Sequence, residues 1–215
     1  RCGVEVTADK DDAQHVSTKT LEKDYDAIFL GLGLGEDSVL GLEGEEGDGV
    51  YGAVHLIEKL KLDGAFGKAF DANKPVQALV VGGGNTAIDI AHELAIAGVD
   101  NVAMVYRRGR AAMSAYAHEL DWGAVDGVKV LNDLVPTKFV REDGKLVGLE
   151  VATAKDGRAV EGTEQVLPCD LVAVAIGQAR LTKLAAAFDG VTLDARGRVE
   201  VDDATCRTGN AKVYA

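Results

Sequence analysis

The stretch that decides the fold is residues 76–87, which read VQALVVGGGNTA. Its first half, between Pro75 and three glycines, is apolar apart from Gln77, as is typical of a buried strand in a parallel sheet. Its second half, from Gly82 to Ala87, fits the pattern G-x-G-x-x-A, which opens a helix directly after such a strand. The stretch therefore predicts a strand, a tight turn and a helix.

This turn has the properties needed to hold a diphosphate. The first glycine makes the turn, the second lets the backbone approach the ligand, and the N–H groups at the helix start face the anion. The small Ala87 allows close packing of helix on strand. A nucleotide site is the favoured interpretation and a mere tight turn is the alternative. The residues assigned to cofactor binding on this ground are Gly82, Gly83, Gly84 and Ala87.

Arginines stand at the end of the next predicted strand, where residues 102–107 read VAMVYR. NAD-binding sites use an Asp or Glu near this position to accept hydrogen bonds from the ribose. No carboxylate occurs between Val102 and Arg110, whereas guanidinium groups offer planar, permanently charged donors for a phosphate. The sequence therefore predicts NADP(H) rather than NAD(H), bound by Arg107 and Arg108, with Arg110 as a further candidate. A solvated arginine turn is the alternative.

Residues 24–35, DYDAIFLGLGLG, are predicted to form a buried strand that runs into a second glycine cluster, Gly31 to Gly35, which competes for the same role. The residues after it, EDSVLGLEGEEGD, are acidic and lack helical periodicity. Carboxylates there would repel a phosphate. We expect a strand end that touches a cofactor through its backbone and does not cradle phosphate.

Composition excludes several classes of function. The 215 residues carry a formal net charge of -12, which disfavours nucleic-acid and anionic-membrane surfaces. No apolar run reaches the roughly 18 residues of a membrane span. The three cysteines are far apart and form no CxxC pair, so we expect reduced thiols, no metal site and a cytoplasmic location. Because the chain starts at Arg1, we interpret it as a piece of a longer protein.

The remaining pattern is mixed. Helices are predicted over 49–62, over 85–98 with Gly98 at the end, and over 112–124, with a connection between domains at 63–75. From 128 to 176, β-rich runs are separated by Asp143-Gly144 and Asp156-Gly157, which are strong hairpin signals. An antiparallel meander is therefore expected beside the parallel strands.

Two of these stretches carry a resemblance to a known family. VVGGGNTAIDIA followed by VAMVYRRGRAAMSA resembles the NADPH-binding domain of the small subunit of bacterial glutamate synthase. It is also similar to the amino-terminal flavin region of dihydropyrimidine dehydrogenases, within the pyridine nucleotide oxidoreductase superfamily that uses FAD and NAD(P). YDAIFLGLGLGEDSVLGLEGE and CDLVAVAIGQA match further blocks of that superfamily.

The resemblance implies an α/β fold in which a Rossmann-like NADPH domain with a β-meander is inserted into an FAD domain. Residues 1–72 and 182–215 would be partial FAD-domain segments, and 73–181 the NADPH domain. Hydride would pass from NADPH to FAD, and electrons onward to another redox domain or subunit. The positions that match the family's cofactor contacts are Asn85 and Thr86 for the pyrophosphate, Gly31 and Gly33 for FAD, and Ala175, Ile176 and Gly177, followed by Gln178, near the nicotinamide.

We assign no catalytic residue, because hydride transfer needs no acid or base from the protein. Asp89 is expected in the first helical turn as an electrostatic cap, and a role for Glu119 stays open. The family's own FAD-binding glycine motif is absent, so this stretch alone should not retain FAD or be active. Alternatives are a dihydropyrimidine dehydrogenase-type or ferredoxin-coupled NAD(P)H oxidoreductase subunit, a non-catalytic nucleotide-binding module and a methyltransferase. The oligomeric state is open.

Overall fold

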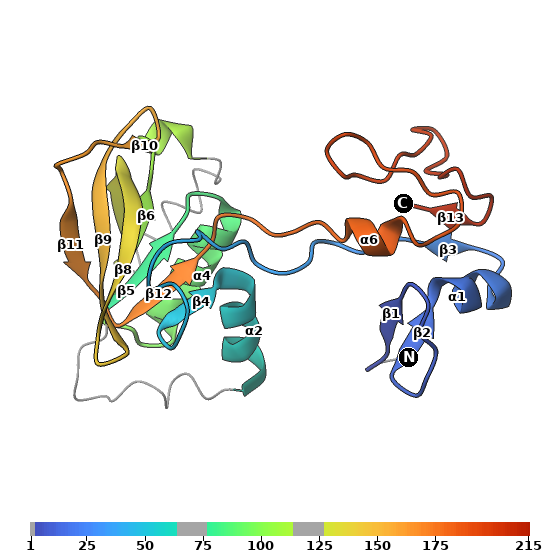
Figure 1. Cartoon of the computed structure of the whole chain (residues 1–215), viewed down its shortest axis with the longest axis horizontal. Helices are drawn as coiled ribbons and strands as arrows, with labels where there is room; N and C mark the ends of the chain where they lie inside the picture. The colour runs from blue at the N-terminus through green and yellow to red at the C-terminus, as the bar shows by residue number, and fades with distance from the viewer. Residues whose placement is uncertain (1–2, 64–76, 114–126) are drawn as a thin grey trace. The chain divides into compact units, whose positions relative to one another are not determined.

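The computed structural model describes residues 3–63, 77–113 and 127–215 (Figure 1). The chain divides into two compact units, a smaller one formed by Arg1–Gly35 with Gln178–Ala215, and a larger one formed by Glu36–Gly177. The resemblance placed the whole of 1–72 in one segment, whereas the described residues from Glu36 to Asp63 pack within the larger unit. The reason is that residues 50–52 form a short strand, which pairs with a strand of the central sheet of the larger unit.

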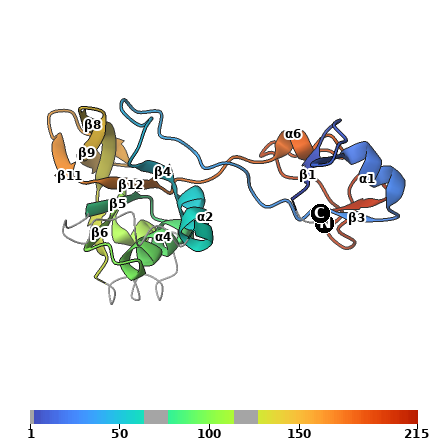
Figure 2. The same ribbon diagram turned by 90° about the horizontal axis from the view of Figure 1, so that it is seen from below.

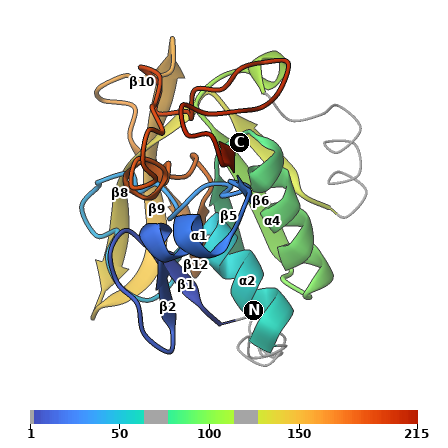
Figure 3. The same cartoon turned by 90° about the vertical axis from the view of Figure 1, so that its right-hand side faces the viewer.

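The larger unit is built on a five-stranded parallel sheet with the order β4-β12-β5-β6-β7. Its strands are β4 (Val50–Gly52), β5 (Gln77–Val81), β6 (Asn101–Tyr106), β7 (Lys129–Asn132) and β12 (Leu171–Val174). Two helices, α2 (Ala53–Asp63) and α4 (Asn85–Ile96), lie side by side on one face of it (Figure 3). The predicted Rossmann-like α/β fold is confirmed.

An antiparallel sheet covers the opposite face, so that this unit has three layers (Figure 2). Its strands are β8 (Leu134–Glu142), β9 (Lys145–Lys155), β10 (Arg158–Ala159) and β11 (Gln165–Pro168), and β9 pairs with the other three. The predicted turns are confirmed. Asp143 and Gly144 have φ of 48° and 80°, and Asp156 and Gly157 have φ of 54° and 75°.

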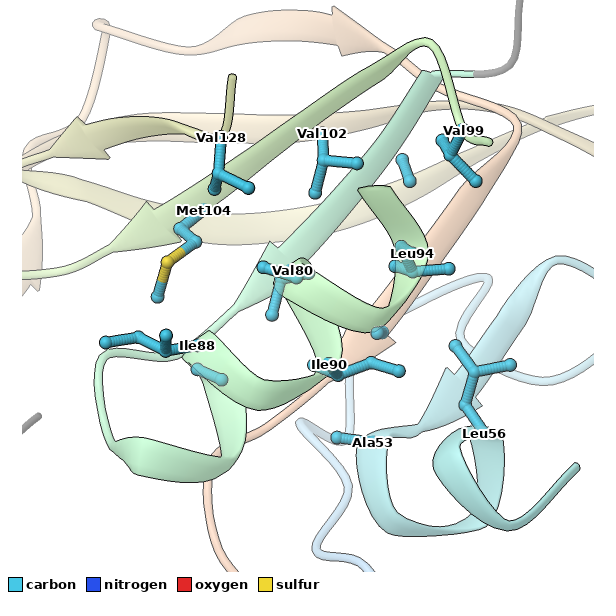
Figure 4. Packing of buried hydrophobic residues seen from close by; sticks show 14 of the residues in the cluster. Ala53, Leu56, Val80, Ile88, Ile90, Leu94, Val99, Val102, Met104 and Val128 are labelled. Carbon is cyan, nitrogen blue, oxygen red and sulfur yellow. The ribbon is translucent and has the colours of Figure 1, made fainter. Parts of the chain in front are cut away.

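Alternation along β5 explains why both faces of the sheet are covered. Ala78 and Val80 face α2 and α4, and Leu79 and Val81 face the antiparallel sheet. A strand buried on both sides reads as a continuous apolar run. Figure 4 shows the helix side, where Ile88, Ile90 and Leu94 of α4 pack over the strands. Other residues labelled there are Ala53, Leu56, Val99, Val102, Met104 and Val128.

The helix predicted over 49–62 begins later than expected. Val50 belongs to the edge strand β4, and α2 starts at Ala53. Asp37 fixes this start, because its carboxylate accepts the N–H groups of Val54 (3.2 Å) and His55 (3.0 Å). A side chain on Gly52 would collide with that carboxylate. Three residues of extended chain are too few to show a strand pattern in the sequence.

Other predicted elements have mixed outcomes. The helix over 85–98 is α4, followed by Gly98 with a φ of 90°. The apolar stretch 24–35 forms only a short strand, β3 (Ile28–Phe29). A 3-10 turn, η1 (Arg110–Ala112), stands where the helix over 112–124 was predicted to begin. Residues 114–126 and the connection over 63–75, apart from Asp63, lie outside the described residues.

The smaller unit contains short elements around its own core of Leu30, Phe188, Val191 and Val213. Two parallel pairs of strands are present, β1 (Glu5–Thr7) with β2 (His15–Ser17), and β3 with β13 (Val213–Tyr214). The helices are α1 (Thr18–Asp24) and α6 (Thr182–Ala185). Within the described ranges of the whole chain, no helix has the length and apolar character needed to cross a membrane.

Cysteine reactivity should report on the core of the larger unit. Cys169 is buried, whereas Cys206 is exposed. Burial raises the pKa of the Cys169 thiol to about 12, with Asp170 adding to the effect. In the unfolded chain this thiol ionises with a pKa of about 8.5, which is lower than in the fold. The fold therefore loses stability as the pH rises above that value. In a Cys2→Ser variant at pH 8, alkylation followed by mass spectrometry should label Cys206 and spare Cys169 until denaturant is added. Equal labelling rates in the native protein would contradict this packing.

Removing the carboxylate that caps α2 should destabilise the larger unit. We expect Asp37→Ala to lower the free energy of unfolding by about 1 kcal/mol, since two N–H groups lose their acceptor. Asp37→Asn keeps a side-chain oxygen and should cost less. Urea denaturation of the wild type and both variants measures the differences, and an Asp37→Ala variant as stable as the wild type would show that Asp37 does not act as a cap.

Candidate functional site

Ligands of open parallel sheets bind outside the carboxyl ends of the strands. In the larger unit the neighbouring strands β12, β5 and β6 end at Val174, Val81 and Tyr106. The turns that follow them hold most of the residues predicted to bind a cofactor. The pairing of the strands therefore brings three stretches that are distant in sequence to one edge of the sheet.

Gly82 follows β5 directly and lies next to the ends of β6 and β12. Its N–H donates to the carbonyl oxygen of Val105 at 3.1 Å, which ties the turn to β6. On the other side, a Cβ at residue 82 would lie 2.3 Å from the carbonyl oxygen of Ala175, just beyond β12. Its φ of 150° is also one that residues with side chains rarely adopt. Only glycine fits this position.

Gly83 is required for a different reason than its predicted role suggests. The ring of Tyr106 lies where a side chain on residue 83 would be, with Cδ2 2.5 Å from the position of a Cβ. The Tyr106 hydroxyl donates to the carbonyl oxygen of Ala112 at 2.7 Å, which anchors the ring. The bare Cα of Gly83 is thus in contact with an aromatic side chain that also lines the site.

The start of α4 is suited to an anion. Its N-cap is Gly84, whose extended backbone (φ -99°, ψ 178°) carries no side chain that could cap the first N–H groups. The start of α2 differs, because Asp37 already occupies it. Ala87 is fully buried against the sheet, as close packing requires. The positive end of α4 therefore remains open to a ligand.

Asp89 does not have the predicted position. Because α4 begins at Asn85, Asp89 is its fifth residue, and no acidic residue stands in the first turn. The expected electrostatic cap is therefore wrong. Glu93, on the same helix, forms an ion pair with Lys61 of α2. This pair links the two helices away from the turn.

Arg107 and Arg108 follow β6 directly, and both are exposed. Within the part of the chain that the structure describes, neither guanidinium has a hydrogen bond or an ion pair with the protein. Arg110 lies in the 3-10 turn that comes next. Two positive charges with no partner among the described residues thus stand beside the glycine turn.

A cavity of about 680 Å³ connects these groups. Nine of the residues predicted to bind the cofactor line it: Gly82, Gly83, Gly84, Thr86, Arg107, Arg108, Ala175, Ile176 and Gly177. Asn85 is exposed at the helix start and Ala87 lies in the core, so neither lines it. Of the described residues around the cavity, none is acidic.

Some lining residues were not predicted. They are Leu40, Leu42, Val81, Val105, Tyr106, Val135, Pro136 and Gly157. The leucines belong to a loop ordered by Glu45, whose carboxylate accepts the N–H groups of Leu40 (2.8 Å) and Gly41 (2.6 Å). No local pattern links this loop to the site. The sequence predicts a hairpin turn at Asp156-Gly157, but it does not show that this turn lies beside the cavity.

Gly31 and Gly33 belong to the smaller unit. Gly33, with a φ of 65°, lines a separate cavity of about 180 Å³ together with Arg180 and Arg198. A Cβ built on Gly31 would lie 3.4 Å from the ring of Phe29. Glu36 and Asp37 follow this glycine cluster in the sequence, and Asp37 caps α2, so the second cluster is not followed by an open helix start.

Comparison with known proteins is consistent with this arrangement. The family model described as "Pyridine nucleotide-disulphide oxidoreductase" matches residues 2–215. The chain is 36% identical to the NADP(+)-dependent formate dehydrogenase subunit beta of Moorella thermoacetica, over 100% of this chain and 30% of that protein. It is 30% identical to the glutamate synthase [NADPH] small chain of Escherichia coli, over 99% of this chain and 49% of that one. The chain thus spans between 30% and 49% of the length of these relatives.

Solved structures share the fold. Thioredoxin reductase of T. acidophilum matches with a TM-score of 0.65 at 21% identity, over 83% of this chain and 53% of that one. An FAD-dependent pyridine nucleotide-disulphide oxidoreductase from Desulfovibrio vulgaris matches with a TM-score of 0.58 at 25% identity, over 89% of this chain and 45% of that one. The family comprises flavoprotein oxidoreductases that use NAD(P), and the predicted resemblance is confirmed. On the family model and these relatives together, the chain belongs to the pyridine nucleotide-disulphide oxidoreductase family.

Proposed function

We propose that the larger unit binds NADPH and serves, in the intact protein, as the entry point for electrons that pass to FAD. The observation that carries this proposal is one cavity shared by an uncapped helix start, a glycine turn and two arginines that have no partner within the described chain. The pyrophosphate would lie at Gly84 to Thr86. The 2′-phosphate of the adenosine would lie at Arg107 and Arg108.

The charges around the cavity favour NADPH over NADH. A 2′-hydroxyl on the ribose is normally bound by a carboxylate after the second strand, and none of the described lining residues is acidic. Two guanidinium groups can instead donate several charge-assisted hydrogen bonds to a phosphate. They would bind it locally in a chain whose overall charge is negative.

Part of the cavity lining is apolar. Leu40, Leu42 and Ile176 line it together with the backbone of Ala175 and Gly177, and Ile176 is 44% exposed. An apolar wall suits a flat, uncharged ring such as the reduced nicotinamide, and it would keep water from that ring. We place the nicotinamide here. The chemistry that NADPH and FAD supply when bound is hydride transfer, for which this chain provides binding and orientation.

FAD is proposed for the intact protein, with Gly31 and Gly33 of the smaller unit near it. This rests on the family and on the FAD-dependent relative from Desulfovibrio vulgaris. Names of relatives point to different final reactions, including formate dehydrogenase, glutamate synthase and NADPH-Fe(3+) oxidoreductase. We therefore propose a shared electron-input unit that delivers to another redox domain or subunit, organised as in the glutamate synthase small chain.

Replacing both arginines should abolish the preference for NADPH. We expect the wild-type chain to bind NADPH more tightly than NADH. The double variant Arg107→Ala, Arg108→Ala should bind NADPH more weakly, by about 1.5–3 kcal/mol for each charge-assisted hydrogen bond that the phosphate no longer receives. NADH binding should change little. Fluorescence titration of both coenzymes at low and moderate salt gives the dissociation constants.

The matched control is Arg196→Ala, which removes an exposed arginine of the smaller unit. It should leave both affinities unchanged, so that a general effect of net charge can be separated from a local one. The proposal fails if NADH binds as well as NADPH, or if the double variant keeps the wild-type preference.

A methyl group on Gly83 should displace Tyr106. Gly83→Ala places a Cβ against the ring, and overpacking of this kind costs about 1–3 kcal/mol of stability. Tyr106→Ala removes the ring, so the two substitutions together should cost less than the sum of their separate effects. Urea unfolding of the four chains gives the coupling energy. Strict additivity would show that the ring does not pack against this glycine.

A further inference from the structure

The hairpin turn between β9 and β10 projects to the arginines of the site. Asp156 and Gly157 are its two central residues, and Lys155 pairs with Arg158 across it. With φ of 54° and 75°, both central residues are in the left-handed region, as a type I′ turn requires. The turn closes the end of the antiparallel layer that lies beside β6.

Gly157 lies beside Arg107 and Arg108. A Cβ built on it would lie 3.8 Å from Cδ of Arg107 and 3.9 Å from Nε of Arg108. Gly157 also lines the same cavity as these two residues and the glycine turn. A side chain at this position would therefore lie next to the side chains of Arg107 and Arg108.

Backbone hydrogen bonds hold the hairpin in place relative to the arginines. The N–H of Asp133 donates to the carbonyl oxygen of Arg108 at 3.4 Å. The N–H of Ala154, three residues before Gly157, donates to the carbonyl oxygen of Asp133 at 2.7 Å. This path runs through main-chain groups alone, so it does not depend on the side chains of the site.

The other Asp-Gly turn has the same conformation but different surroundings. Asp143 and Gly144 adopt the same kind of turn between β8 and β9, with φ of 48° and 80°. A Cβ at Gly144 would meet nothing within 4 Å. Gly144 is therefore needed for its backbone conformation only, whereas Gly157 has a neighbouring site as well.

We propose that Gly157 is a specificity-determining residue, whose bare Cα forms the outer wall of the subsite for the 2′-phosphate. The absence of a side chain leaves room for a phosphate beside the guanidinium groups of Arg107 and Arg108. A carboxylate at this position would pair with those groups and repel the phosphate, while leaving the rest of the coenzyme untouched. This inference rests on the proposed binding of NADPH by the same cavity.

Two isosteric substitutions test it. Asn and Asp have nearly the same shape, and both tolerate the left-handed conformation better than other residues with side chains. Gly157→Asp should bind NADPH about tenfold more weakly than Gly157→Asn, equivalent to about 1.4 kcal/mol. The two variants should bind NADH equally. Fluorescence titration with NADPH and with NADH measures all four constants.

Gly144→Asp and Gly144→Asn form the matched control pair, since they make the same changes in the same type of turn away from the arginines. We expect this pair to bind NADPH equally. Thermal unfolding of each variant checks that the Asp and Asn forms are equally folded.

The outcomes separate the two proposals. If the wild-type chain prefers NADPH but the two Gly157 variants bind it equally, the inference about the turn is overturned and the proposed function stands. A loss of NADH affinity in Gly157→Asp as large as the loss for NADPH would also overturn it, because the effect would not be specific to the 2′-phosphate. If the wild-type chain shows no preference, the proposed function itself fails.

Discussion

In the larger unit, the backbone at Gly82 approaches the carbonyl group of Ala175 more closely than any side chain would permit. This approach, together with the hydrogen bond from Gly82 to Val105, holds the ends of β5, β6 and β12 together. The start of α4, the arginines and the stretch after β12 all take their positions from those strand ends. A methyl group at this one position would separate the turn from β12 and with it the two ends of the cavity.

The proposed anion site depends on local charges and not on the charge of the whole chain. Two helices of the same unit begin close to the carboxyl edge of the sheet. A carboxylate from Asp37 satisfies the start of α2, while the start of α4 follows three glycines that have no side-chain acceptor. The acidic residues are numerous, yet within the described chain they leave the surroundings of Arg107 and Arg108 free of ion pairs. A basic site of this kind can exist on an acidic protein because solvent and salt screen the more distant charges.

Much of this arrangement could be predicted because its signals are local. The apolar run before the glycines, the helix up to Gly98 and the two Asp-Gly turns each encode their conformation within a few residues. The residues that bring non-adjacent segments together could not be predicted in the same way. β4 is a strand only because β12 lies beside it, and Leu40 and Leu42 line the cavity only because Glu45 orders their loop.

The role of Tyr106 is a second example of a contact that the sequence does not predict. Its position at the end of a strand was predicted, but its ring fills the space above Gly83, a contact that no spacing in the sequence encodes. The boundary between the two units differs from the expected one for a similar reason, since Asp37 and β4 bind residues after Gly35 to the larger unit. Packing between distant segments decides both cases.

The antiparallel layer has a consequence for how this protein can diverge. Val151 and Ala152 are buried in the core, but the chain becomes exposed at Thr153 and reverses direction further on, at Asp156. The tip of this hairpin can therefore change in sequence or length without disturbing the hydrophobic interior. Related chains could therefore differ at the surface beside the arginines while keeping the same hydrophobic core, so that changes in this surface would have little effect on thermal stability.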